Sequence, residues 1–318
     1  MIRTAPKPLP LPIVPHPKPE RLPKRNRMTL AIGMLYVNGV IVAADTQITL
    51  PDGRTEDRTK IEAFSAATGT YAIAASSTDT DASDTLVASA KRDIEGIDPK
   101  SSIGIETAVK DAMADWYKTY QYHPPEQRPY VQLLVGAAIR RSDKAQDEIC
   151  LYQCEPPSTM NRKTLTNSGG YVAIGEAKAI ANPLYTTLFI GFRNAELASV
   201  HVCLERISYL MFRAKKEFRS SVGGDTDVVV LRSGRVEPQW VDIIDMRVAE
   251  GFGHNLNAAL ASTASLVVAE HAPNDPSPAE IMELASNLHV WGLPYKNTQF
   301  RVRGTFRTAL GSKGVDVS

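Results

Sequence analysis

Residues 28–49 read MTLAIGMLYVNGVIVAADTQIT, and RTKI follows at positions 58–61. Two runs rich in β-branched and other apolar residues, TLAIGMLYV and VIVAAD, flank Asn38 and Gly39. An Asn-Gly pair between such runs is a strong signal for a tight turn between two antiparallel strands. The stretch therefore predicts a β-hairpin whose first strand opens at Thr29.

The position of the turn sets the pairing of this hairpin. A two-residue turn at the Asn-Gly pair would place Val37 opposite Val40. Asp45 would then lie opposite Ile32, and strand alternation would turn its side chain away from that of Thr29. We expect a different turn, a bulge or a twist at the strand end if the two side chains are to meet.

A threonine that becomes the first residue of a mature protein carries its own base. Its α-amine has an ordinary pKa of about 7.7–8.0 and lies close enough to take the hydroxyl proton near neutral pH. This chemistry is open to Thr29 only if residues 1–28 are absent from the working protein. Alone, a threonine behind a methionine is uninformative, Asp45 is explained as a turn residue at a strand end, and Lys60 as a solvated loop charge. Only the combination of the three residues supports the hypothesis of a catalytic site.

Residues 1–27 differ sharply in composition from the rest of the chain. They hold eight prolines and seven lysines or arginines against one glutamate. This composition favours extended polyproline segments over a packed core, so we expect a disordered leader over 1–28. Three explanations remain open: a recognition tail for a proline-binding domain, a removable pro-segment, or a start codon assigned too far upstream. The small residue behind Met28 favours the last, because it permits removal of an initiator methionine.

The remainder of the chain is mildly acidic, since the net charge of the whole chain is only +1 despite its basic leader. This balance argues against nucleic acid as the main partner. The cysteines Cys150, Cys154 and Cys203 are too few for a disulfide framework and lack a zinc-site spacing, so we expect no metal or cofactor. No apolar run reaches the roughly 20 residues of a membrane span, and no signal-peptide core is present. We expect a soluble, cytoplasmic protein.

Periodicity and turn signals predict alternating blocks of strands and helices after the hairpin and a polar loop at 50–58. The predicted strands lie at 60–64, 70–76, 130–139, 148–154, 171–174 and 226–231. The predicted helices lie at 79–94, 105–121, about 175–188 and about 194–218. Three of these helices carry apolar stripes that indicate core packing: Leu86, Ala90 and Ile94; Val109, Met113 and Trp116; Val200, Leu204, Ile207 and Met211. This order indicates an α+β fold with helices outside stacked antiparallel sheets.

The C-terminal residues form a separate block in the pattern. A helix is expected from about Asn255, and Ser277 reads as the N-cap of a further helix. The segment 296–310 alternates enough for a strand. We expect a main domain over 29–245 and an extension over 246–318 that packs on this body or on a neighbouring subunit.

Five segments together resemble the proteasome β-subunit superfamily of N-terminal-nucleophile hydrolases. The matching segments are TLAIG from Thr29, GVIVAADTQIT with Asp45, TKIEAF with Lys60, IGEAKAIANPLY at 174–185 and VGGDTDVVVL at 222–231. They spread over about Thr29 to Trp240, and IGEAKAIANPLY is most similar to the Anbu branch of bacterial proteasome-like proteins. The resemblance implies a four-layer αββα sandwich of two stacked antiparallel sheets with helices outside.

The resemblance also implies a role for each site residue. The Thr29 hydroxyl would attack a peptide carbonyl while its α-amine takes the proton. Lys60, paired with Asp45 and held as a cation, would lower the pKa of that amine and hydroxyl. A backbone N–H near Ser76 would stabilise the oxyanion, a contribution of about 2.7–4 kcal/mol for one donor.

The sequence departs from the family pattern at several of these places. The interval from Asp45 to Lys60 is one residue shorter, and the glycine that normally supplies the oxyanion amide is replaced around Ser76. In the mid-chain motif, Gly175 is followed by Glu176 where the family has a serine, and both are kept as secondary site candidates. The aspartate expected before the double glycine is absent from FRSSVGG.

These features predict a threonine-type peptidase within a self-assembled, homo-oligomeric ring or stack. Its expected partners are unfolded polypeptides or peptides as substrates, with an ATP-dependent unfoldase as an open possibility, and neither nucleic acid nor a membrane. Two alternatives stay open. A catalytically silent structural subunit is expected if residues 1–28 remain attached or the altered oxyanion motif distorts the site. A small-molecule amidase of the same superfamily is the other.

Overall fold

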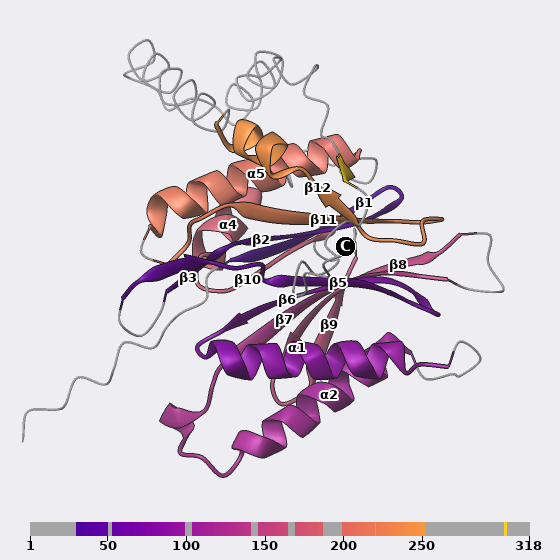
Figure 1. Ribbon diagram of the computed structural model, residues 1–318, viewed down its shortest axis with the longest axis vertical. Coiled ribbons are helices and arrows are strands. Elements are labelled where there is room, and N and C mark those ends of the chain that lie inside the picture. Colours follow the sequence, from indigo (N-terminus) through magenta and orange to yellow (C-terminus); the bar gives the residue numbers. More distant parts are fainter. Residues whose placement is uncertain are drawn as a thin grey trace, which may run out of the picture.

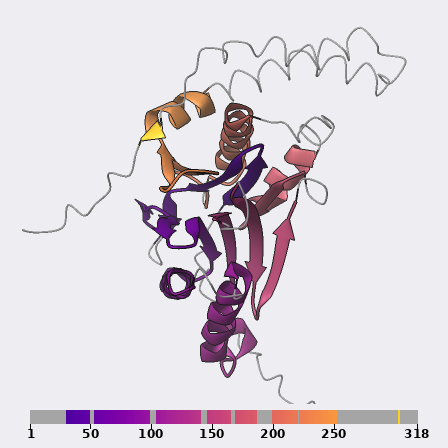
Figure 2. The same ribbon diagram turned by 90° about the vertical axis from the view of Figure 1, so that its right-hand side faces the viewer.

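The structure of the protein is a computed structural model. It describes residues 30–49, 53–98, 104–140, 146–164, 169–186, 199–219 and 221–251, with the backbone of a short strand at 302–303. Two β-sheets stack face to face, and helices cover the outer face of each, as both views show (Figures 1 and 2). These four layers confirm the predicted α+β, αββα architecture.

The first sheet has six strands in the order β10-β1-β2-β11-β12-β13. They are β1 (Ala31–Tyr36), β2 (Gly39–Asp45), β10 (Tyr171–Ile174), β11 (Thr226–Arg232), β12 (Gln239–Val241) and β13 (Val302–Arg303). The central strand β2 is buried along its whole length. Its side chains alternate between layers: Ile41 and Ala43 pack on the helix side, and Val40 and Val42 pack against the second sheet.

The second sheet has five strands that follow their order along the chain. They are β5 (Ile61–Ala66), β6 (Gly69–Ser77), β7 (Val131–Ile139), β8 (Glu148–Glu155) and β9 (Thr159–Lys163). A separate two-stranded sheet pairs β3 (Gln47–Thr49) with β4 (Thr55–Asp57), inside the segment predicted as a loop. All three residues of β4 are exposed, so the sequence held no apolar alternation to signal this strand.

The outer helices are α1 (Thr80–Glu95), α2 (Ile105–Tyr120), the 3-10 turn η1 (Pro125–Gln127), α4 (Lys178–Tyr185), α5 (Val200–Glu217) and a helix at 243–251. Three of them, α1, α2 and α5, form where the apolar stripes predicted them, whereas the helix at 243–251 was not predicted. The predicted stripe residues of α1 and α2 are buried against the second sheet, and Leu204, Ile207 and Met211 of α5 are buried against the first. Helix α4 begins three residues later than predicted, because Gly175 has a positive φ of 95° that no helix accommodates.

The hairpin at the start of the body has a different register from the one predicted. Tyr36 pairs with Gly39, so the turn falls on Val37 and Asn38. A Cβ atom at Gly39 would lie 2.0 Å from the carbonyl oxygen of Leu231 on the neighbouring strand, so this glycine is needed for strand packing. The prediction placed Gly39 in the turn because the Asn-Gly signal says nothing about the strand that packs beside it.

The described end of the chain packs on the first sheet. In the helix at 243–251, Met246 and Ala249 are buried in the cluster formed by this sheet and α5. Strand β13 pairs with β12 at the edge of the same sheet. The expected domain boundary at residue 245 falls within this helix, and the division into a body and an extension stays a prediction. The helices expected from Asn255 and after Ser277 lie outside the described residues.

Candidate active site

Asp45 and Lys60 come from different sheets and meet in a buried ion pair. Asp45 is the last residue of β2, and Lys60 immediately precedes β5. The Lys60 Nζ atom lies 3.0 Å from Asp45 Oδ2, and the two side chains are 3% and 0% exposed. The structure therefore brings together two of the three residues predicted to form the site.

The second carboxylate oxygen of Asp45 binds the start of the hairpin. The backbone N–H of Leu30 donates to Asp45 Oδ1 at 3.2 Å, and the N–H of Gly223 donates to Oδ2 at 3.3 Å. Asp45 also donates its own N–H to the Leu30 carbonyl at 3.3 Å, so the two residues lie opposite each other. The carboxylate thus reaches both the backbone of its own sheet and the lysine of the other sheet from the end of its strand, without a bulge in the hairpin.

Thr29 lies outside the described residues. Its covalent neighbour Leu30 is buried and holds the Asp45 carboxylate through its N–H. The atom that joins residue 29 to the body is therefore itself a hydrogen-bond donor to the candidate site.

The environment of Lys60 acts on its pKa in two directions. Burial of the ammonium lowers the pKa of Lys60 and is the larger effect. Attraction to Asp45, Asp57 and Asp227 opposes it and favours the charged form. Carboxylates from three different strands thus favour the charged form of one buried ammonium, and Asp45 is the one in direct contact with it.

Asp57 and the double glycine complete the wall of the site. Thr46 donates its hydroxyl to Asp57 Oδ1 at 3.1 Å and accepts the Asp225 N–H at 2.8 Å. Gly224, with φ +65°, lies so close that a Cβ there would be 2.1 Å from Asp57 Oδ1 and 2.4 Å from Thr46 Oγ1. The double glycine is therefore needed for close approach to the site.

Ser76 lies on the second sheet, close to the end at which Lys60 enters. It pairs with Gln132 of β7 in the ladder that continues through Ser77 and Val131. One pair further, the Thr78 N–H donates to the Tyr130 carbonyl at 3.0 Å. N–H groups directed at one neighbour recur at every second residue of an antiparallel strand, so the N–H of Ser76 points toward β7. Those of the residues on either side of it, Ala75 and Ser77, point toward the β5 side, where Lys60 lies.

Gly175 and Glu176 lie at the same end of the sandwich. Ile174, at the end of β10, pairs with Ala31, which places Gly175 opposite Leu30. The Gly175 N–H donates across the gap between the sheets to Gln132 Oε1 at 3.1 Å. Glu176 is half-buried, and its carbonyl accepts the Ala179 N–H at 3.3 Å as α4 begins.

Two rows of residues, one on each sheet, therefore face each other at this end. The row on the first sheet consists of Gly175, Leu30, Asp45 and Thr226. The row on the second sheet includes Ser76, Gln132 and Glu155. Two contacts bridge the rows: Lys60 with Asp45, and Gly175 with Gln132. Every predicted site residue within the described ranges therefore lies at this end of the sandwich.

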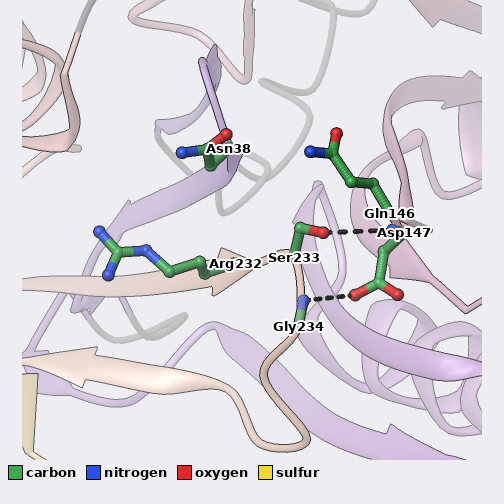
Figure 3. Close-up of a pocket in the computed structure, with 6 residues that line it drawn as sticks. All are labelled: Asn38, Gln146, Asp147, Arg232, Ser233 and Gly234. Carbon is green, nitrogen blue, oxygen red and sulfur yellow. Dashed lines mark hydrogen bonds between the residues drawn. The ribbon is translucent and has the colours of Figure 1, made fainter.

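A pocket lies at the opposite end of the sandwich, beside the turn between β1 and β2. None of the predicted site residues lines it (Figure 3). It has a volume of about 510 Å³ and is lined by Asn38, Gln146, Asp147, Arg232, Ser233 and Gly234. The Gly234 N–H donates to Asp147 Oδ2 at 2.8 Å, and the Asp147 N–H donates to Ser233 Oγ at 3.1 Å. These bonds join the turn after β11 to the start of β8, which indicates a structural role.

Among the described residues, no group of histidine, cysteine, aspartate and glutamate side chains is arranged to hold a metal ion. All three cysteines are buried with free thiols, and burial raises the pKa of each, to about 11 for Cys203. Raised pKa values disfavour the nucleophilic thiolate. No helix in the described part of the chain is long and apolar enough to cross a membrane.

The arrangement of layers and strands is that of solved Anbu structures. The chain is similar to an Anbu mutant from Hyphomicrobium sp. strain MC1 (15% identity, TM-score 0.56, 74% of this chain and 96% of that chain covered). It is similar to Anbu from Yersinia bercovieri, described as an ancestral β-subunit (15%, TM-score 0.57, 73% and 97% covered). It is also similar to the Anbu complex from Pseudomonas aeruginosa, solved as a helical assembly (14%, TM-score 0.57, 79% and 99% covered). The chain has the Anbu fold.

The Anbu fold is a branch of the N-terminal-nucleophile hydrolase fold, so the resemblance read from the sequence is confirmed at the level of the fold. No protein-family model and no curated protein matches the sequence itself. In this Anbu fold, the mid-chain motif that begins at Ile174 lies beside the start of the hairpin, and the double glycine lies against Asp45. The motifs that carried the resemblance thus converge in space.

Sequence reasoning missed several contributors to this site. Asp57 lay in a segment predicted as a loop, and Asp227 lay within the predicted strand at 226–231 with no motif that singled it out. The FRSSVGG segment gave a usable signal, because a double glycine before a buried strand often marks close backbone approach. Gln132 gave none, since a single glutamine in an apolar strand has no motif around it.

Proposed function

We propose that this protein is a threonine-type N-terminal-nucleophile hydrolase that cleaves peptide bonds. The Thr29 hydroxyl is the nucleophile, and the α-amine of a liberated Thr29 is its base. The observation that carries the proposal is the buried pair of Asp45 and Lys60, whose aspartate binds the N–H of Leu30. Near the α-amine of a liberated Thr29, a buried ammonium would act more strongly than a solvent-exposed lysine, because low polarity strengthens its field.

The first step is attack on the carbonyl carbon of the substrate. The Thr29 Oγ–H bond breaks as its proton passes to the α-amine, and a new Oγ–C bond forms. The Lys60 cation favours the neutral amine and the developing alkoxide through its charge, and Asp45 keeps the ammonium in place. The α-ammonium then gives the proton to the leaving amine as the scissile C–N bond breaks, which releases the amine and leaves an ester on Thr29.

The oxyanion requires a donor on the opposite side of the reacting carbon. The backbone next to Ser76 is the proposed source, through the N–H of Ala75 or Ser77, which the ladder directs to the side of Lys60. Replacement of the family's glycine leaves this donor in place, since it belongs to the backbone. Water then attacks the ester and gives a proton to the α-amine; the Oγ–C bond breaks, the carboxylic acid leaves, and the proton returns to Thr29 Oγ.

A homo-oligomeric ring, stack or helical array is the proposed setting for this chemistry. One solved Anbu structure is described as a helical assembly, and this chain covers 99% of it. Unfolded polypeptides or peptides are the proposed substrates, and an ATP-dependent unfoldase is a further proposed partner. A silent structural subunit of such an assembly is the alternative if the amine of Thr29 stays blocked.

Two measurements on the same protein test this function. Intact mass of the protein from its natural host should correspond to a chain that begins at Thr29. That form should hydrolyse unstructured peptides, and Thr29→Ala should abolish the hydrolysis while the fold stays intact by circular dichroism. A retained leader supports the structural subunit instead. Hydrolysis that persists in Thr29→Ala would rule out the proposed nucleophile.

A further inference from the structure

Gln132 joins the two sheets beside the candidate site. It is a glutamine near the start of β7, only 1% exposed, and pairs with Ser76 of β6. Its Oε1 accepts the Gly175 N–H of the other sheet at 3.1 Å. We propose that Gln132 is a positioning residue that sets the spacing between the oxyanion-binding strand and the strand beside the nucleophile. This inference rests on the hydrolase function proposed above and adds a residue to it.

The acceptor end of Gln132 holds the backbone next to the start of the hairpin. Gly175 has φ +95° and no side chain, so its own backbone is all that the protein can use to fix it. It lies opposite Leu30, the residue to which Thr29 is covalently joined. The bond from Gly175 to Gln132 therefore ties the neighbourhood of the proposed nucleophile to the second sheet.

The other end of the amide is fixed by a carboxylate. The Gln132 NH₂ group donates to Glu155 Oε1, and Gln153 donates to the same oxygen at 3.1 Å. An ionised carboxylate only accepts hydrogen bonds, so it holds the NH₂ group toward Glu155 and leaves Oε1 for Gly175. Hydrogen bonds to a charged acceptor are also stronger than neutral ones, which makes the orientation firm.

These contacts occupy both ends of the amide. Gln132 is thus engaged by protein groups at its acceptor and its donor, and its role is to hold Ser76 and Gly175 in place rather than to touch the substrate. Acyl transfer depends steeply on such placement, because a displacement of about 1 Å can cost on the order of 100-fold in rate. Loss of the bridge should therefore lower kcat and leave KM nearly unchanged.

The test is an exchange of the two partners, measured on the form that begins at Thr29. Gln132→Glu places two carboxylates face to face and should lower kcat by at least about tenfold, with KM within about threefold of wild type. Glu155→Gln keeps an acceptor for the amide and should have a smaller effect. The double variant Q132E/E155Q restores a donor–acceptor pair in the opposite sense and keeps an acceptor for Gly175. Its kcat should return to within about threefold of Glu155→Gln alone.

Gln153→Leu is the matched control. Gln153 binds the same oxygen of Glu155 but has no bond to Gly175. If Gln132 acts through the bridge, Gln153→Leu should leave kcat within about twofold of wild type, whatever it does to the melting temperature. A general loss of stability at this sheet end would affect both glutamine variants alike.

Three results would overturn the proposal. An unchanged kcat in Gln132→Glu, with an active wild type, removes the positioning role and leaves the hydrolase function standing. A folded double variant whose kcat stays as low as that of Gln132→Glu also removes the positioning role. If Gln132→Glu alone does not fold, a double variant with a kcat far below that of Glu155→Gln removes it instead. A wild type that begins at Thr29 and is inactive overturns both the function and the role.

Discussion

The Nζ atom of Lys60 lies 3.0 Å from the carboxylate of Asp45, and the pair is almost completely closed to solvent. Transfer of two charges out of water is costly, and their attraction offsets that cost only when the geometry is good. The hydrogen bonds from Leu30 and Gly223 give Asp45 further partners. The protein therefore keeps a costly arrangement at the point where its two sheets and its hairpin meet, which is typical of a functional site.

Removal of Lys60 should destabilise the fold strongly. Lys60→Met leaves the Asp45 carboxylate buried without its counter-ion, and loss of one partner of a buried pair costs about 3–5 kcal/mol. Lys110→Met is the control, because its pair with Glu106 lies on the surface of α2, where such pairs contribute about 0.3–0.5 kcal/mol. Urea unfolding of both variants measures the difference. Similar urea midpoints for the two variants would show that the buried pair stabilises the fold no more than the surface pair does.

The plot of kcat/KM against pH should be bell-shaped. The rate rises as the α-amine of Thr29 loses its proton, below its ordinary pKa of about 7.7–8.0 because the Lys60 cation favours the neutral amine. It falls when Lys60 loses its charge. Because burial lowers the pKa of Lys60, this fall should begin below the ordinary lysine value of about 10.4.

Asp57→Asn should move only the alkaline side of that bell. Asp57 raises the pKa of Lys60, so its neutralisation should shift the fall to lower pH, while the amide oxygen still accepts from Thr46. Glu56→Gln, one residue earlier on β4 and also exposed, should leave the profile in place. The measurement is kcat/KM against pH for the three proteins. A shift to higher pH in Asp57→Asn would contradict the role given to Lys60.

The double glycine offers a test of close approach to the site. Gly224→Ala places a Cβ 2.1 Å from Asp57 Oδ1, whereas Gly234→Ala, at a similar positive φ, meets nothing within 4 Å. Both variants carry the cost of about 1–2 kcal/mol for a left-handed residue. We expect Gly224→Ala to cost at least about 1 kcal/mol more and to lower activity as well. Thermal unfolding of both variants measures the difference. Equal losses of stability would mean that the Asp57 and Thr46 side chains move aside at no cost.

The helix at 243–251 should belong to the folding unit of the body. Met246 is buried under it, and Glu250 pairs with Lys215 of α5 at 2.8 Å. Met246→Ala should cost about 2–5 kcal/mol, as for other buried large-to-small changes. Ile244→Ala, which changes an exposed residue of the same helix, should cost far less. Equally small effects of both on the denaturation midpoint would place this helix outside the cooperative core.

The sequence predicted those elements whose own pattern decides their structure. The stripe of Leu86, Ala90 and Ile94 defined α1, and the apolar run YVAI coincided with β10. These segments bury one face or both faces, so local periodicity carries the information. The meeting of Asp45 with Lys60 followed only from the resemblance, because no pattern within either segment relates the two residues.

The remaining features depend on neighbours that are distant in sequence. Gly39 lies in a strand because Leu231, nearly 200 residues away, packs against it. Gln132 matters because Gly175 lies across the gap between the sheets. A pattern within one segment cannot report such contacts, and they decide both the register of the hairpin and the shape of the site.

The most direct test of the central claim is a covalent one. A threonine-directed electrophile, such as a peptide epoxyketone that bridges a hydroxyl and its adjacent amine, should be mixed with the protein from its natural host. Peptide mapping by mass spectrometry should find one adduct, on an amino-terminal Thr29, and Lys60→Met should slow its formation. An unmodified Thr29 in a folded protein with a free amino terminus, or an adduct elsewhere, would contradict the account.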